Sequence, residues 1–251
     1  MESKKIIITG GATRIGAAIA KSLAGYDIKI SIHFNKSINE AKKLKRKLED
    51  LGSTVYLIKA DLNNQKQTQK IVKEAYHKMK GLDCLINNAS VFENDNLKNF
   101  SEESFSKHMN INLRAPAILI KNFSKHVKTS QGVVINILDQ RIEKLTPYFF
   151  SYTLSKTALG TLTTTSAMRL SPNIRVNGVS PGPTLKNKRQ SETHFKKQWK
   201  SVLLKKKVDL DNICDSVKFL IGNNNVTGQI INVDSGQRLA WMTPDIINSK
   251  E

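Results

Sequence analysis

The chain has 251 residues, of which 39% are hydrophobic, enough to bury a substantial core within one α/β domain. Its formal net charge is +19, from 40 lysines and arginines against 21 acids, but the basic residues are spread without the arginine forks or aromatic platforms of a nucleic-acid-binding protein. The sequence shows neither a secretory signal nor an apolar run of membrane-spanning length, and so we expect a cytoplasmic protein that binds neither nucleic acid nor a membrane.

Short β-branched runs alternate along the chain with longer segments of helical periodicity. The short runs predict strands at 4–9, 28–34, 54–59, 83–87, 132–138, 174–179 and 229–233. The segments between them predict helices at 15–24, 37–51, 65–80, 102–128, 152–170 and 211–221. Strict alternation of strand and helix predicts right-handed βαβ units and a parallel sheet with helices on both faces.

No internal repeat or low-complexity linker divides the chain, and so we expect a single domain over 1–251, ending in a polar tail at 242–251. Residues 183–207 carry no clear strand or helix signal, which predicts a lid beside the substrate site. Cys84 and Cys214 have no CxxC partner and are expected to be buried thiols. The five histidines show no metal-ligand spacing, and we expect no metal site.

A glycine-rich loop follows the first predicted strand and opens a helix, in the sequence ITGGATRIGAAIA at 8–20. Gly10, Gly11 and Gly16 would let the backbone approach a pyrophosphate, while the helix N-terminus offers N–H donors and a favourable dipole. At the start of a βαβ chain, such a loop predicts a dinucleotide site.

Further motifs follow in a fixed order: NNAS at 87–90, NINL at 110–113, Y-x3-K at 152–156 and SPGPT at 180–184. Together with the glycine-rich loop, they resemble the short-chain dehydrogenases/reductases over almost the whole chain. The resemblance implies a Rossmann-type, doubly wound sheet of seven parallel strands. It also implies a homotetramer, in which the helices at 102–128 and 152–170 make the contacts between subunits.

The second predicted strand ends in HFNKS, at 33–37, where NAD-binding proteins carry an acid that holds the ribose 2′-hydroxyl. Without that acid, Lys36 and Ser37 can receive a 2′-phosphate, and so we expect NADPH; the positive charge of the chain would also attract it. By resemblance, the cofactor-binding residues are Gly10, Arg14, Ile15, Gly16, Phe34, Asn35, Lys36, Ser37, Asp61, Leu62, Asn88, Ala89, Ser90, Tyr152, Lys156, Pro181, Gly182 and Thr184.

Tyr152 and Lys156 share a helix face, one turn apart. A phenol has an ordinary pKa of about 10, and a neighbouring ammonium would favour the phenolate and strengthen the phenol as an acid. A second Y-x3-K pair, Tyr76 and Lys80, precedes a strand at the amino edge of the sheet, whereas ligands of open α/β sheets bind at the carboxyl edge. Tyr152 is therefore the expected catalytic tyrosine. By resemblance, Asn112 would steady a water relay behind Lys156, although a plain helix-bending role is the alternative.

Asp139 stands thirteen residues before Tyr152, where most of the family carries a serine that donates a hydrogen bond to a carbonyl oxygen. An ionised carboxylate only accepts hydrogen bonds, and it would repel a developing alkoxide. A pterin ring instead takes hydride at carbon and a proton at nitrogen, so that an acid beside the phenol can relay the proton. Asp139 thus favours a pterin over a ketone, unless the carboxyl is held protonated.

Asp139, Arg14, Ser90 and Phe92 together resemble the pteridine reductase and dihydromonapterin reductase branch. The resemblance assigns Arg14 to cofactor phosphate and pterin and Phe92 to stacking on the pterin, with Ser90, Asp139 and Tyr152 as further substrate-binding residues. The alternatives are a solvated Arg14 and a Phe92 that only packs in the core.

The expected activity is NADPH-dependent reduction of a dihydropteridine (dihydromonapterin, dihydrobiopterin or dihydrofolate) to its tetrahydro form. Two alternatives stay open: a carbonyl reductase that acts on a substrate such as a 3-oxoacyl thioester, and a catalytically silent NADPH-binding module.

Overall fold

The computed structural model describes residues 4–127, 131–187 and 189–241. All seven predicted strands are present to within two residues at each end, and they form one parallel sheet in the order β3-β2-β1-β4-β5-β6-β7. They are β1 (Lys4–Ile8), β2 (Ile28–Phe34), β3 (Thr54–Lys59), β4 (Cys84–Asn87), β5 (Gly132–Ile137), β6 (Ile174–Pro181) and β7 (Ile230–Val233). The predicted doubly wound α/β architecture is confirmed.

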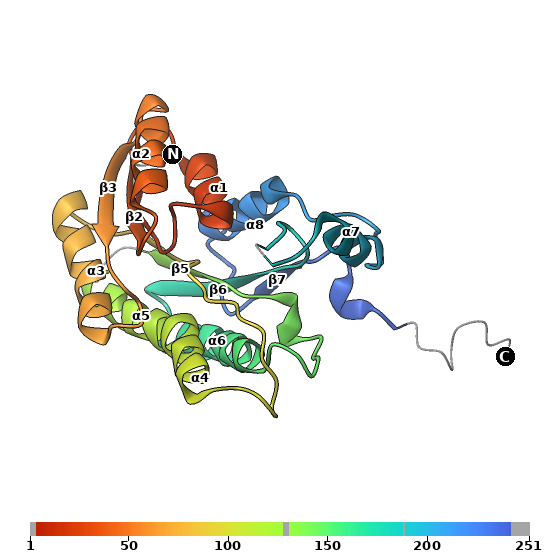
Figure 1. The fold of residues 1–251 in the computed structure, drawn as a ribbon. Helices are drawn as coiled ribbons and strands as arrows, with labels where there is room; N and C mark the ends of the chain where they lie inside the picture. Colours follow the sequence, from red (N-terminus) through yellow and green to blue (C-terminus); the bar gives the residue numbers. More distant parts are fainter. Residues whose placement is uncertain (1–3, 128–130, 188, 242–251) are drawn as a thin grey trace, which may run out of the picture.

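Helices cover both faces of the sheet (Figure 1). One face carries α1 (Arg14–Leu23), α2 (Ile38–Asp50) and α8 (Leu210–Gly222). The other carries α3 (Gln65–Met79), α5 (Ala115–His126) and α6 (Phe150–Leu170), with α4 (Glu102–Met109) packed against α6. Because both faces are covered, the central strands carry buried apolar runs; Ile6, Ile7 and Ile8 of β1 are at most 1% exposed.

The strand order reverses at β1. From β1 the chain winds outward through β2 and β3, and then returns to β4 on the other side of β1. The loops that follow β1 and β4 therefore diverge at the carboxyl edge, which is where open α/β sheets form their ligand crevice.

The single helix predicted over 102–128 is wrong in one respect. The chain forms α4, then a π-helical turn at Asn110–Arg114, and then α5 up to His126; residue 128 lies outside the described ranges. A π turn adds one residue to a helical turn and has no hydrophobic periodicity of its own, so the pattern could not reveal it.

The predicted lid is also more ordered than its sequence suggests, because it contains helix α7 (Glu192–Lys200). Ser191 caps that helix, since its hydroxyl accepts a hydrogen bond from the His194 N–H. Phe195 of α7 is buried and faces the cavity described below. The predicted polar tail at 242–251 lies outside the described residues.

Cys84 and Cys214 are both buried free thiols, as predicted. Across the part of the chain that the structure describes, no helix has the length and apolar character needed to cross a membrane.

Candidate active site

A cavity of about 640 Å³ opens at the carboxyl edge of the sheet, between the glycine-rich loop, the end of β5 and the lid. Most of the site residues predicted from the sequence line it. These are Gly10, Arg14, Ile15, Gly16, Asn35, Asp61, Leu62, Asn88, Ala89, Ser90, Phe92, Asp139, Tyr152, Lys156, Pro181, Gly182 and Thr184.

Four predicted site residues do not line this cavity. Phe34 is buried at the end of β2, Lys36 is exposed beyond it, and Ser37 is the N-cap residue that precedes α2. Asn112 is buried behind the cavity wall. Lys36 and Ser37 follow Asn35, which does line the cavity, so they stay next to the expected ribose position.

The glycine-rich loop forms a close-fitting cradle. Gly10 has a φ of +59°, and a Cβ there would lie 2.9 Å from the Cα of Ala89. A Cβ on Gly16 would collide with the Gly10 carbonyl and lie 2.5 Å from Nδ2 of Asn88. Thr13, which precedes α1, makes no side-chain cap, and so the first N–H groups of that helix remain for an anion. The cradle fits a dinucleotide pyrophosphate.

His33 holds the glycine-rich loop from β2. Its Nδ1 accepts a hydrogen bond from the Gly10 N–H at 3.2 Å, and its Nε2 lies 3.1 Å from the carbonyl of Ala60. Burial lowers the pKa of His33 from 6.5 to about 4, against weaker raising effects from the Ala60 carbonyl and the Asp61 charge. The imidazole is therefore neutral at pH 7, which its role as an acceptor requires.

Because the folded pKa of His33 lies below its unfolded value, His33 stabilises the protein above pH 6.5, and this contribution disappears as the pH falls toward about 4. The full difference is worth about 3 kcal/mol of unfolding free energy. We expect His33→Gln, which keeps one acceptor and one donor but does not titrate, to lose less stability between pH 7 and pH 5 than the wild type. Urea unfolding at the two pH values measures it; equal losses in both proteins would contradict this role of His33.

Tyr152 and Asp139 are hydrogen-bonded to each other. The Tyr152 hydroxyl donates to Oδ2 of Asp139 at 2.9 Å, and both side chains line the cavity. Lys156 is one turn further along α6, with Nζ 5.9 Å from the centre of the Tyr152 ring and donating to the carbonyl of Ile137 at 2.7 Å. The structure thus joins β5, which ends at Ile137, to the face of α6 that carries the Tyr–Lys pair.

The expectation that a neighbouring ammonium lowers the pKa of Tyr152 is wrong for this arrangement. Burial and then the charge of Asp139, with its hydrogen bond, raise the Tyr152 pKa well above 10; Arg141 and Ser90 act in the opposite direction. Burial also lowers the pKa of Lys156 to about 8, against the raising effect of Asp139. Tyr152 therefore keeps its proton at neutral pH, and the carboxylate accepts the hydrogen bond that the phenol donates.

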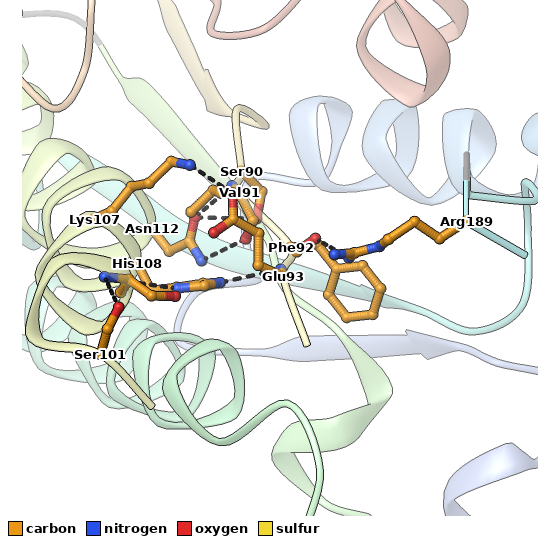
Figure 2. Close-up of polar contacts among 10 residues, drawn as sticks. Ser90, Val91, Phe92, Glu93, Ser101, Lys107, His108, Asn112 and Arg189 are labelled. Atoms are coloured by element: carbon orange, nitrogen blue, oxygen red, sulfur yellow. Dashed lines mark hydrogen bonds and ion pairs between the residues drawn. The ribbon is translucent and has the colours of Figure 1, made fainter. Parts of the chain in front are cut away.

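Asn112 ties the segment after β4 to the catalytic helix. Its Oδ1 accepts from the Val91 N–H at 2.9 Å and from the Ser90 hydroxyl at 3.1 Å, while Nδ2 donates to the Val91 carbonyl and to Oγ of Ser155, both at 3.0 Å. The π turn between α4 and α5 holds Asn112 in this place. In Figure 2, Asn112 and His108 reach residues 90–93 from the helices, and Arg189 approaches Phe92 from the other side.

Phe92 lies in an aromatic wall of the cavity. Its ring is stacked on Phe149, with centres 4.6 Å apart and planes 11° apart, and it meets Tyr152 edge-on at 4.7 Å. The guanidinium carbon of Arg141 lies 4.7 Å from the centre of the Phe149 ring and 5.4 Å from that of Phe92. Phe149 has a φ of +59°, a strained conformation for a bulky residue, which fixes its ring at this position.

Two arginines connect the lid to the rest of the site. Arg14 donates to the carbonyls of Leu185 and Lys186 at 3.1 and 3.0 Å, so its guanidinium holds the start of the lid. Arg189, in the lid itself, donates to the carbonyl of Phe92 at 2.6 Å. The lid is therefore joined both to the glycine-rich loop and to the aromatic wall.

The sequence did not identify His33, Arg141 or Phe149 as site residues. Arg141 follows Asp139 at the carboxyl end of β5, and Phe149 precedes Tyr152 by nearly one helical turn, so strand-end position and helical spacing were available signals. No signal predicted the contact of His33 with Gly10, since it depends on how β2 lies beside the loop.

Comparison with known proteins identifies the family. The family profile described as short chain dehydrogenase matches residues 4–197. The chain belongs to the short-chain dehydrogenase family.

Two solved structures resemble this short-chain dehydrogenase closely, and both are FolM alternative dihydrofolate reductase 1 with NADP. The Brucella suis protein is 38% identical with a TM-score of 0.93, covering 97% of this chain and 98% of its own. The Brucella canis protein is also 38% identical, with a TM-score of 0.89 and 96% coverage of both chains.

A third similar protein is a curated relative known by its sequence similarity. The dihydromonapterin reductase of Enterobacter sp. (strain 638) is 24% identical over 239 residues, which cover 94% of this short-chain dehydrogenase and 97% of the relative. The predicted membership of the family is confirmed, and its relatives include proteins of the pteridine reductase-like branch.

Proposed function

We propose that this short-chain dehydrogenase is an NADPH-dependent reductase of a dihydropteridine. The observation that carries the proposal is the hydrogen bond from Tyr152 to Asp139 at 2.9 Å, on a cavity wall formed by Phe92. The names of the two Brucella structures and of the Enterobacter relative support it. Dihydromonapterin, dihydrobiopterin and dihydrofolate are the candidate substrates.

The cofactor half of the cavity supports a pyrophosphate at Gly10 and Gly16, with the ribose near Asn35 and its 2′-phosphate toward Lys36 and Ser37. No acid occupies 33–37 to repel that phosphate. Bound NADPH supplies the hydride for C6 of the pterin. In this proposal Lys156 holds the nicotinamide ribose, and Arg14 exchanges its lid carbonyls for cofactor phosphate and pterin.

The proton for N5 of the pterin comes from Tyr152, the buried phenol that stays protonated at neutral pH. Asp139 accepts the hydrogen bond from that phenol and can pass on a proton from water to replace the one donated. No alkoxide forms when a C=N bond is reduced, and so the carboxylate meets no developing anion on the substrate. It does disfavour a phenolate at Tyr152, and a proton taken up from solvent through Asp139 as the phenol donates would avoid that charge. Charge and atoms balance: one hydride reaches C6 and one proton reaches N5.

The alternative with some support is a carbonyl reductase, because Tyr152, Lys156 and Asn112 are all in place and Asp139 would serve if protonated. The hydrogen bond argues against this alternative, since Asp139 accepts from Tyr152 and from the Arg141 N–H in the same arrangement.

The family resemblance also supports a homotetramer built through α4, α5 and α6. Light scattering of the protein as it elutes from a size-exclusion column would test this assembly.

Consumption of NADPH with a panel of substrates tests the proposal. We expect turnover with at least one of 7,8-dihydromonapterin, dihydrobiopterin and dihydrofolate, and little with acetoacetyl thioester. NADH in place of NADPH is the control for the cofactor assignment. Brisk reduction of the thioester without reduction of any dihydropterin would overturn the proposal, and tight NADPH binding without any turnover would favour the silent module.

A further inference from the structure

Arg141 contacts the Asp139 carboxylate through two groups. Its main-chain N–H donates to Oδ1 at 2.9 Å, and its Nη1 lies 3.4 Å from the same oxygen. With Oδ1 engaged in this way, Oδ2 accepts the hydrogen bond from the Tyr152 hydroxyl at 2.9 Å. These contacts fix which oxygen of the carboxylate faces the phenol.

The local fold explains why these contacts form. Asp139 follows the buried end of β5 and caps the 3₁₀ turn at Gln140–Ile142, so that Arg141 lies on that turn next to the carboxylate it pairs with. The aromatic wall holds the guanidinium, which lies 4.7 Å from the centre of the Phe149 ring. The two charged side chains are only 16% and 20% exposed, so water screens their attraction less than at the surface.

The charge of Arg141 opposes that of Asp139 at the phenol. The carboxylate raises the pKa of Tyr152, and Arg141 lowers it. Other charged or titratable groups surround the pair on neighbouring elements: Lys156 on α6, His108 on α4, Arg14 on α1, Arg189 in the lid and His194 on α7. Among the residues that the structure describes, none of these five makes a hydrogen bond or ion pair with Asp139.

We propose that Arg141 is a positioning residue of this active site, which orients Asp139 and balances its charge so that a carboxylate can stand beside Tyr152. This inference rests on the proposed pterin reduction for its catalytic meaning. It also accounts for a site that has an acid in place of a neutral donor: the extra negative charge comes with its own positive partner, two residues further along the chain.

The test compares two variants of Arg141. Arg141→Met keeps much of the side-chain volume but removes the charge, and Arg141→Lys keeps the charge but not the planar group that packs on the rings. Both leave the main-chain N–H in place. Arg238→Met is the matched control, because Arg238 pairs with Glu143 at 2.7 Å outside the cavity lining. Arg141→Gln, neutral and polar, replaces the Met variant if that protein does not fold.

Two measurements are made. The first is kcat and KM for dihydropterin reduction. The second needs no substrate: a crystal structure of each variant in its NADP complex shows whether Tyr152 still donates a hydrogen bond to Oδ2 of Asp139. For Arg141→Met, we expect kcat to fall by about tenfold or more with little change in KM, and the hydrogen bond from Tyr152 to Asp139 to be lost. Arg141→Lys should restore most of kcat and the hydrogen bond, and Arg238→Met should match the wild type in both measurements.

A purely structural role of Arg141 would raise KM or lower stability in both Arg141 variants while the hydrogen bond from Tyr152 to Asp139 is kept, and that result would overturn the inference. The two proposals fail separately. If Arg141→Met loses the hydrogen bond but no dihydropterin is reduced by the wild type, the proposed function is wrong and the role of Arg141 stands. If dihydropterin is reduced and Arg141→Met matches the wild type in both kcat and the hydrogen bond, the role of Arg141 is wrong.

Discussion

Tyr152→Phe should reduce kcat for dihydropterin reduction by about 10²- to 10⁴-fold, which is the usual contribution of a positioned general acid. The phenol is the buried proton donor of the cavity, and phenylalanine keeps its ring against Phe92 while removing the proton. NADPH binding, measured by fluorescence titration, should change little, because the change removes a single hydroxyl from a large cofactor surface. Steady-state NADPH oxidation gives the kcat.

The chain offers a matched control for this variant. Tyr76 is the tyrosine of the other Y-x3-K pair, near the end of α3 and outside the cavity lining. Tyr76→Phe should leave kcat close to the wild-type value. If Tyr152→Phe also kept wild-type turnover, the assignment of the proton donor would fail, whatever the substrate.

Asp139→Ser should change the preference between substrates as well as the rate. We expect dihydropterin turnover to fall by about 10²-fold, because the variant loses the acid that relays the proton. We expect reduction of acetoacetyl thioester to rise, because a serine hydroxyl donates to a developing alkoxide that a carboxylate repels. The measured quantity is the ratio of kcat/KM for the two substrates, taken in one assay with NADPH.

Asp215→Ser is the control for that experiment, since Asp215 is an exposed residue of α8 that makes a surface ion pair with Lys218. It should leave the ratio unchanged. A ratio that stays the same in Asp139→Ser would mean that the carboxylate does not select the substrate, and the argument for a pterin would lose its main support.

The sequence predicted the sheet well because its central strands are buried on both faces and carry runs of β-branched residues, as in Ile6, Ile7 and Ile8. It also placed Tyr152 and Asp139 in one site: the tyrosine follows a strand at the carboxyl edge, and Asp139 stands thirteen residues before it, where the family resemblance puts the serine. The short-chain dehydrogenase motifs predicted the other loops of the site, since these motifs follow the strands in chain order and lie at the carboxyl edge of the sheet.

Other features depend on three-dimensional neighbours that a pattern does not encode. The direction of the Tyr152 pKa was predicted wrongly, because burial and a touching carboxylate outweigh an ammonium 5.9 Å from the ring. The stack of Phe149 on Phe92 depends on a backbone φ of +59° at a residue that rarely adopts it. The π turn that places Asn112 likewise interrupts a helix whose periodicity gave no sign of it.

The central claim is that the Asp139–Tyr152 pair delivers a proton to a ring nitrogen. A crystal structure of the complex with NADP and a dihydropterin tests this directly. Our account predicts N5 of the ring at about 3 Å from the Tyr152 hydroxyl or the Asp139 carboxylate, with the ring beside Phe92. A ring bound with N5 directed away from both groups, with Asp139 turned toward solvent, would contradict it.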